Sequence, residues 1–387
     1  MKIITTTDEL RAFSAELAER PFFAVDTEFM REKTYWPILC LIQAAADGAE
    51  AIIDPMAPGI DLQPFLDLLS DPRVTKVFHA ARQDIEIFHL LMGAVPAPIF
   101  DTQIAAMACG FGEQIGYEPL VRTLLGASID KANRFTDWAR RPLSAAQLTY
   151  ALSDVTHLRD AYVILKTRLE AEVRLGWVEE EMSVLRDPAL YRVDPKTAWT
   201  RLKLRGLRPG DVGPLIALSE WREREAQEKN VPRGRVLKDE ALFELARIKP
   251  STPEELGAAR TIPQGFERSR TAQQILDAIA AGRKIPRADL PVIDRDDRRA
   301  NAPPDVVELL KVLLKRQSEK YSVAARLIAT GEDLDLIALG RTDVPALEGW
   351  RREVFGDVAT AMLEGRVALT LRNGAIELIE TDKKTGA

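Results

Sequence analysis

Two carboxylates separated by one residue close an apolar segment near the start of the chain. The segment, PFFAVDTEFM, spans residues 21–30 and places Asp26 and Glu28 after four apolar residues. Those four residues predict a buried strand, and alternate residues of a strand share a face, so both acids point the same way. Two carboxylates that close repel each other and lose hydration unless a cation lies between them. The pair therefore indicates either a metal site or a strand end that meets a solvated turn.

Two further acids have the setting that a metal site needs. Asp84, in VFHAARQDIEIF, follows a predicted strand at the start of a helix, where exposed N–H groups favour a carboxylate. Asp154, in YALSDVTHL, lies within a long predicted helix, and Tyr150 shares its face four residues earlier. Together with the first pair, these acids could hold two hard divalent ions, Mg²⁺ or Mn²⁺. Such ions, about 3.5–4 Å apart, activate water for phosphodiester hydrolysis and stabilise the leaving oxygen.

The composition is that of a globular protein with two or three domains. The chain has 387 residues, of which 46% are hydrophobic and 29% charged. It contains no apolar run long enough for a transmembrane helix, and its start, MKIITTTDEL, lacks the apolar core of a signal peptide. Cys40 and Cys109 stand in apolar surroundings, which is typical of buried thiols in a reducing compartment. We therefore expect a cytoplasmic monomer with no membrane partner.

Charge is distributed unevenly along the chain. The net charge is −6, which argues against a general nucleic-acid binder. Residues 1–200 carry a net charge of −9, whereas residues 201–300 carry 21 Lys and Arg against 16 Asp and Glu, a net of +5. A basic middle on an acidic protein indicates a phosphate-bearing partner, although a solvated, arginine-rich helical face gives the same pattern. The residues that we expect to bind the substrate there are Arg222, Arg233 and Arg235.

Strand and helix patterns alternate over the first 170 residues. Three apolar, β-rich runs, FFAVDTEF, LCLIQAAA and EAIIDP, are followed by a fourth strand at TKVFHAA and by several helices. Three strands in succession and then strand–helix crossovers predict a mixed sheet with helices on both faces. A long helix comes next, and Ser144 and Gln147 form a capping box at its start. These are the elements that must position the four acids and the tyrosine.

The strand patterns then give way to helices with proline-rich joints. The segments DEALFELARIKPSTPEELGAART and GEDLDLIALGRTDVPALEGWRR resemble each other, which suggests two related helical domains. The last run, VALTLRNGAIELIE, alternates around Asn373-Gly374 and predicts a β-hairpin. We therefore expect an α/β domain over residues 1–175, a linker over 176–207, a helical domain over 208–288 and a second helical domain with the hairpin over 296–387.

Three motifs together resemble those of a known enzyme family. DTE, HAARQD and the Y-x-x-x-D of YALSD are similar to the motifs of the DEDD 3′–5′ exonucleases that use a tyrosine; in the other subgroup a histidine stands where this chain has Thr149. The segments TYWPILCLIQ, DTQIAAM and TDWARRPLSAAQLTYALSDV resemble ribonuclease D throughout. The middle helical segment resembles the HRDC module, and the last resembles a diverged second copy. The segment RTIPQGF departs from the Gly-led turn of that module.

The resemblance implies a fold and a set of metal ligands. The fold is an α/β ribonuclease H-like exonuclease domain, a mixed sheet flanked by helices, followed by two all-α HRDC-type domains. Carried over by position, Asp26, Glu28 and Asp154 would hold the first metal ion. Asp26 would also hold the second ion, which Asp84 would reach through water.

The resemblance also implies roles for residues that do not bind metal. Tyr150 would orient the attacking water. A phenol with an ordinary pKa of about 10 is a poor base at neutral pH, so the metal ions must do most of the deprotonation. The backbone around Phe29 and Met30 would receive the terminal nucleotide, with apolar side chains against its base.

The expected activity is 3′–5′ exoribonuclease action on tRNA precursors and other small structured RNAs, releasing 5′-mononucleotides with two divalent metal ions. A single-strand DNA 3′–5′ exonuclease of repair or proofreading type is the alternative, because the two-metal chemistry requires no 2′-OH. A catalytically inactive RNA-binding module is a further alternative, which the presence of all four acids and the tyrosine disfavours. A helicase is excluded, because the chain has no Gly-Lys dipeptide and hence no Walker A loop.

Two other polar residues have simpler explanations. Asp101, in IFDTQ, has the position of a helix N-cap, which we favour over a role as a fifth metal ligand. His79 is expected to be a buried hydrogen-bonding partner on a strand, because the three histidines of the chain do not form H-E-x-x-H spacing.

Overall fold

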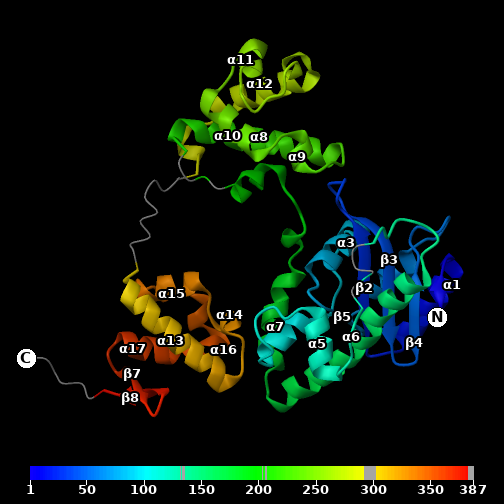
Figure 1. Ribbon diagram of the computed structural model, residues 1–387, viewed down its shortest axis with the longest axis vertical. Helices are drawn as coiled ribbons and strands as arrows, with labels where there is room; N and C mark the ends of the chain where they lie inside the picture. The colour runs from blue at the N-terminus through cyan, green and yellow to red at the C-terminus, as the bar shows by residue number, and fades with distance from the viewer. Residues whose placement is uncertain (131, 133–135, 203, 205–206, 292–301, 382–387) are drawn as a thin grey trace, which may run out of the picture.

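The computed structural model describes residues 1–130, 132, 136–202, 204, 207–291 and 302–381 (Figure 1). An α/β unit comes first in the chain, a helical unit follows it, and a second helical unit with a small hairpin ends the chain. None of the helices in these residues is both long and apolar enough to cross a bilayer.

A six-stranded mixed sheet forms the centre of the first unit. Its strands lie in the order β1-β4-β3-β2-β5-β6. Strand β2 pairs antiparallel with β3 and parallel with β5, so it is a central strand of the sheet. The bounds are β1 Ile3–Ile4, β2 Phe22–Met30, β3 Ile38–Ala46, β4 Ala49–Ile53, β5 Thr75–Phe78 and β6 Ile99–Asp101. The mixed sheet was predicted, whereas β1 and β6 are too short to leave a pattern in the sequence.

Helices cover both faces of this sheet. One apolar cluster joins the sheet to the first three helices, and another joins it to the next four. The bounds are α1 Thr7–Ala18, α2 Gln63–Leu69, α3 Arg82–Met92, α4 Thr102–Ala108, α5 Tyr117–Leu125, α6 Ala145–Ala171 and α7 Leu175–Ser183. The predicted capping box is present at the start of α6, where the Ser144 hydroxyl accepts a hydrogen bond from the Gln147 N–H at 3.2 Å.

The middle helical unit packs around its own apolar core. Three short helical turns, η2 Val184–Arg186, η3 Pro188–Leu190 and η4 Pro195–Arg201, lead into it. Its helices are α8 Pro209–Glu228, α9 Arg233–Val236, α10 Asp239–Ile248, α11 Pro253–Gly257 and α12 Arg270–Arg283. Helices α8 and α12 cross at Gly213 and Gly282, where a Cβ on either glycine would lie within 2.6 Å of the other helix's backbone. Only glycine permits so close a crossing.

The last unit shares an apolar core with the first. Its elements are α13 Pro304–Tyr321, α14 Ala325–Ile328, α15 Gly331–Ala338, α16 Gly349–Arg351, α17 Asp357–Leu363, β7 Val367–Arg372 and β8 Ala375–Glu380. The last two strands form the predicted hairpin around Asn373-Gly374. Trp350 stacks on Trp177 of α7 with ring centroids 4.6 Å apart, and the Ala324 N–H donates to the Met107 carbonyl of α4 at 2.9 Å. The end of the chain thus covers an apolar surface of the α/β unit.

Candidate active site

Strand β2 presents Asp26 and Glu28 on one face and Thr27 on the other. Ala24, on the face of Asp26, belongs to the apolar cluster that includes α4 and α6, and Val25, on the opposite face, belongs to the cluster that includes α1 to α3. The alternation predicted from the sequence is therefore the one that the fold uses. The two acids face α6, and Thr27 faces α3.

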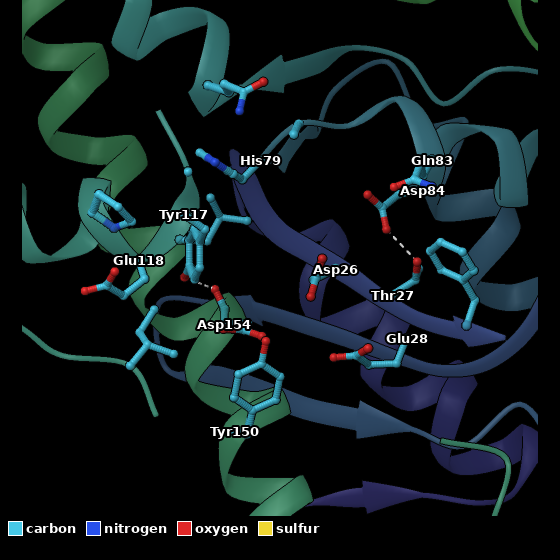
Figure 2. A pocket seen from close by; sticks show the side chains of 17 residues that line it. Asp26, Thr27, Glu28, His79, Gln83, Asp84, Tyr117, Glu118, Tyr150 and Asp154 are labelled. Atoms are coloured by element: carbon cyan, nitrogen blue, oxygen red, sulfur yellow. Dashed lines mark hydrogen bonds between the residues drawn. The ribbon is translucent and has the colours of Figure 1, made fainter. Parts of the chain in front are cut away.

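Three carboxylates converge from β2 and α6. One oxygen from each of Asp26, Glu28 and Asp154 lies within 4.8 Å of the other two. Figure 2 shows the three side chains around one space, with Asp84 on the far side of Asp26. Carboxylate oxygens are the ligands that hard divalent ions such as Mg²⁺ and Mn²⁺ prefer. The donor set and its spacing therefore fit a divalent cation.

Asp84 is held in place from the sheet. It lies in the first turn of α3, is 7% exposed, and accepts a hydrogen bond from the hydroxyl of Thr27 (Figure 2). The residue between the two acids of β2 thus orients the acid of α3. All four predicted carboxylates come together in the fold.

Burial makes the ionised form of these acids costly. Desolvation, and then the negative charge of Asp154, raise the pKa of Asp26 to about 8. Desolvation, and then the charge of Asp26, raise the pKa of Asp84 well above its usual range, although the Thr27 hydrogen bond opposes the shift. Within the described residues, neither acid forms an ion pair with a Lys or Arg, and the largest influences on both pKa values raise them. A bound cation would supply the missing positive charge.

Tyr150 lies one turn before Asp154 on α6 and points its hydroxyl toward the acids (Figure 2). Burial, and then the charges of Asp154 and Glu28, raise its pKa above the ordinary value of 10.0. The phenol therefore stays protonated at neutral pH and can hold a water or a phosphate oxygen as a hydrogen-bond donor.

A cleft of about 570 Å³ opens over these side chains. Phe29 lines it beside the four acids and Tyr150, as expected for a residue that receives a base. Met30 instead packs against the cluster of Cys40, Trp138 and Ala151. Of these two residues, only Phe29 has its side chain at the expected nucleotide site.

The opposite wall of the cleft contains Tyr117 and His79. The sequence did not single out Tyr117, and it predicted His79 on a strand and not in the cleft. Tyr117, at the start of α5, donates its hydroxyl to the backbone carbonyl of Asp154 (Figure 2). His79 lies just after β5, lines the cleft, and places Nδ1 3.0 Å from the Thr102 hydroxyl. Desolvation lowers the pKa of His79, so the imidazole is neutral. No local motif marks Tyr117, because its partner is 37 residues away.

Asp101 is the N-cap that the sequence predicted. Its carboxylate accepts hydrogen bonds from the N–H groups of Gln103 at 2.8 Å, Ala80 at 3.0 Å and Ala81 at 2.9 Å. It therefore ties the start of α4 to the turn that leads into α3. Among the described residues, Asp101 does not belong to the group of acids whose oxygens converge for a metal ion.

The predicted basic residues of the middle unit have different settings. Arg222 is 5% exposed and donates to the Leu237 carbonyl and to Asp239, so its guanidinium is engaged within the protein. Arg233 is held by Glu223 and by the hydroxyl of Tyr35, and is therefore also engaged within the protein. Arg235 is exposed and remains a candidate for binding a substrate.

Comparison with known proteins identifies the families that two parts of the chain match. Residues 1–170 match the family model described as 3′–5′ exonuclease, and residues 215–279 match that of the HRDC domain. The chain is 51% identical to the ribonuclease D of Granulibacter bethesdensis, covering 98% of this chain and 96% of that protein. It is 50% identical to the ribonuclease D of Gluconacetobacter diazotrophicus, covering 95% of this chain and 94% of the relative.

A solved structure extends the similarity to the whole fold. The crystal structure of Escherichia coli RNase D, described as an exoribonuclease involved in structured RNA processing, superposes with a TM-score of 0.82 at 29% identity. The match covers 94% of this chain and 98% of that one. The chain therefore belongs to the ribonuclease D family of 3′–5′ exoribonucleases.

Proposed function

We propose that this exoribonuclease removes nucleotides from the 3′ ends of tRNA precursors and other small structured RNAs, releasing 5′-mononucleotides. The observation that carries the proposal is the group of three carboxylates within 4.8 Å at the floor of a cleft, in a chain that carries an HRDC domain. RNA processing by the Escherichia coli relative supports a structured RNA as the substrate class.

Two divalent metal ions are part of the proposal. Asp26, Glu28 and Asp154 would hold one, and Asp26 would hold the other, which Asp84 would reach through water. When bound, Mg²⁺ or Mn²⁺ would activate water and stabilise the leaving 3′ oxygen of the phosphodiester. Asp84 is already oriented by Thr27, so its carboxylate needs little rearrangement to take part.

The other side chains of the cleft bind and orient. Tyr150, which stays protonated, would donate a hydrogen bond that fixes the attacking water in line with the scissile bond. Phe29 would lie against the terminal base. The result is cleavage of the P–O3′ bond of the penultimate nucleotide, with the phosphate leaving on the released mononucleotide.

Digestion of a 3′-extended tRNA beside a single-stranded DNA of equal length tests the substrate class. We expect stepwise 5′-mononucleotide release from the RNA with Mg²⁺ or Mn²⁺, and none with EDTA. Asp154→Asn serves as the inactive control for contaminating nucleases. Faster cleavage of the DNA would favour the repair or proofreading type of exonuclease and would refute the RNA assignment.

The RNA anchor in the middle unit is proposed to be Arg235 with Lys238. Both side chains are exposed, whereas Arg222 and Arg233 are occupied inside the protein. Each phosphate contact releases counterions and steepens the salt dependence of affinity. The variant Arg235→Glu/Lys238→Glu should bind a tRNA precursor more weakly and with a shallower salt slope, measured in Ca²⁺ to suppress cleavage. An unchanged salt slope would show that Arg235 and Lys238 do not bind the phosphates of the RNA.

The domain plan is also part of the proposal. We propose an exonuclease domain over residues 1–175, a linker over 176–207 whose first helix, α7, packs on that domain, the HRDC domain over 208–288 and a second, HRDC-like domain over 296–387. The similar helix–joint–helix segments in the two helical parts support the last assignment. We further propose a monomer that acts in the cytoplasm, and light scattering of the purified protein checks the first of these two points.

A further inference from the structure

We propose that Arg141 is a positioning residue for the hydrolysis: its guanidinium fixes both the β-bulge beside Glu28 and the loop that backs Tyr150. The inference rests on the role proposed for Tyr150, and it concerns a side chain that does not line the cleft. Arg141 immediately precedes Pro142, a short distance before α6, and contacts three separate segments of the exonuclease domain, at Cys40, Asp54 and Trp138.

The contacts of Arg141 use its whole fork of donors. Nε and Nη2 each donate to one carboxylate oxygen of Asp54 at 2.7 Å, just beyond the end of β4. Nη2 also donates to the Cys40 carbonyl of β3 at 2.7 Å, and Nη1 donates to the Trp138 carbonyl at 2.7 Å. The side chain is 27% exposed and Asp54 is 15% exposed, so solvent only partly screens this pair.

The Cys40 contact lies at an irregularity of the sheet next to the metal-binding acids. In the pairing of β2 with β3, Glu28 lies opposite Leu41 and Phe29 lies opposite Leu39, so Cys40 is the additional residue of a bulge. A bulge increases local twist and re-aims the neighbouring side chains. By holding the carbonyl of the additional residue, Arg141 fixes the direction in which Glu28 and Phe29 leave the strand.

The Trp138 contact lies behind the tyrosine. Trp138 is 2% exposed and belongs to the same apolar cluster as Cys40 and Ala151. Its ring centroid lies 6.2 Å from that of Tyr150, with the two planes tilted by 31°. Since Arg141 holds the Trp138 carbonyl, it fixes the position of the indole ring beside which the phenol of Tyr150 lies. One guanidinium therefore determines the spacing between Glu28 on β2 and Tyr150 on α6.

A lysine cannot reproduce this set of contacts. Arginine presents its donors in a rigid planar fork, whereas the ammonium of lysine is a point charge on a flexible stem. In Arg141→Lys we expect the rate of bond cleavage to fall about 10- to 100-fold, because small displacements of reacting groups cost that much. The KM for a short RNA should change less than threefold, because no contact with the substrate is removed.

A double-mutant cycle with Tyr150→Phe tests the coupling. Single-turnover rates on a short 5′-labelled RNA are measured at saturating Mg²⁺ for the wild type, Arg141→Lys, Tyr150→Phe and the double variant. If Arg141 acts through the tyrosine, its substitution should cost much less in the Tyr150→Phe background, since the position of a phenol that is absent no longer matters. A residual effect through Glu28 should remain, so the double variant is slower than Tyr150→Phe alone.

The outcomes separate this inference from the role on which it rests. If Tyr150→Phe is impaired but the two losses multiply fully, Arg141 is a structural residue and the inference is overturned. If Tyr150→Phe cleaves at the wild-type rate, the role of Tyr150 fails and the inference fails with it. Should Arg141→Lys not fold, the same cycle is run with Asp54→Asn, which weakens the fork but keeps the arginine.

A matched control shows whether any arginine fork would have the same effect. Arg341 makes an equivalent two-point contact with Asp343, at 2.9 Å and 2.6 Å, on the surface of the last unit. Both side chains are more than half exposed. Arg341→Lys should therefore leave the cleavage rate and the melting temperature unchanged, and a loss there equal to that of Arg141→Lys would overturn the inference.

Discussion

Acidic side chains lie in the cleft and also where the HRDC domain meets the exonuclease domain, but their pKa values shift in opposite directions at the two sites. In the cleft, the pKa of Asp26 is raised to about 8 by burial and by Asp154. At the domain contact, Glu223 is 1% exposed, and burial alone would raise its pKa too. Hydrogen bonds from Arg233 and Tyr35 instead hold the pKa of Glu223 below its ordinary value.

The difference indicates which cluster is built to receive something. At Glu223 the chain itself supplies an arginine and a tyrosine hydroxyl, so the charge is already compensated when the protein folds. In the cleft the compensation must come from outside, because within the described residues Asp26 and Asp84 form no ion pair with a Lys or Arg. Buried like charges without a protein cation are typical of metal sites, whereas compensated ones hold domains together.

Removal of one carboxylate should have the largest effect. Asp26→Asn and Asp154→Asn each take away a negative ligand, so hydrolysis of an RNA oligonucleotide should be nearly abolished at any Mg²⁺ concentration. Without metal, neither variant should melt below the wild type, because each relieves repulsion between buried acids. Activity rates and melting curves with and without Mg²⁺ measure both effects, and substantial activity in either variant would refute the metal assignment.

Tyr150→Phe should have the next largest effect. It removes a hydrogen-bond donor that orients water but leaves every metal ligand in place, so the rate should fall by about 10² to 10⁴. Affinity for a short RNA should barely change. Single-turnover kinetics measures the rate, and titration in Ca²⁺ measures the affinity; a wild-type rate would show that the phenol only packs against Trp138.

The pH dependence of stability should differ between metal-free and metal-bound protein. The pKa of Asp26 is about 8 in the folded protein and 3.8 as its ordinary value, so between these values the unfolded chain has lost a proton that the folded chain retains. Stability from this group is thus complete below about pH 4 and is lost as the pH rises toward 8. The melting temperature of the metal-free wild type, compared with Asp26→Asn, should therefore fall between pH 5 and 8.

Metal should cancel that slope, because a cation replaces the proton. The comparison with Asp26→Asn removes the titration of Asp26 together with its effect on the neighbouring Asp84, whereas the two proteins share the titrating groups outside the cleft. If the difference between the melting temperatures of the two metal-free proteins is the same at every pH from 5 to 8, burial does not raise the pKa of Asp26. The contrast with Glu223 then fails.

The features that sequence analysis predicted depend on short-range spacing. Asp26 and Glu28 share a face because they are two residues apart in a strand, and Tyr150 and Asp154 share one because they are a turn apart in a helix. The hairpin at Asn373-Gly374 is equally local. Such patterns survive folding because each side chain's direction follows from its own element.

The features that it missed depend on contacts between distant segments. Arg141 meets Cys40, which is 101 residues away, and Tyr117 meets Asp154, which is 37 residues away. The setting of Arg222 has the same origin: a basic residue in a helix is expected at the surface, but Arg222 pairs with Asp239 and lies buried. Composition counts charges, whereas only the fold decides which of them are paired.

The smallest expected effect concerns the compensated cluster. Tyr35, which is 3% exposed, donates its hydroxyl to Glu223 and accepts from Arg233 at 2.9 Å. Tyr35→Phe keeps the ring under the Arg233 guanidinium but removes these hydrogen bonds, at a cost of about 1 kcal/mol. Cleavage of a short RNA should stay within twofold of the wild type, because no group of the cleft is altered.

The change should instead appear at the contact between the domains. The backbone N–H groups of Tyr35 and Trp36 donate to the Asn230 side chain at 3.1 and 3.0 Å, so they report directly on whether the HRDC domain stays attached. Hydrogen exchange at these two amides should accelerate in Tyr35→Phe. Tyr191→Phe is the matched control, since Tyr191 is equally buried but bonds to the Leu185 carbonyl instead. If exchange at these two amides is the same in both variants, the cluster around Glu223 does not hold the two domains together. The hydroxyl of Tyr35 would then contribute only to general stability, as the buried hydroxyl of Tyr191 does.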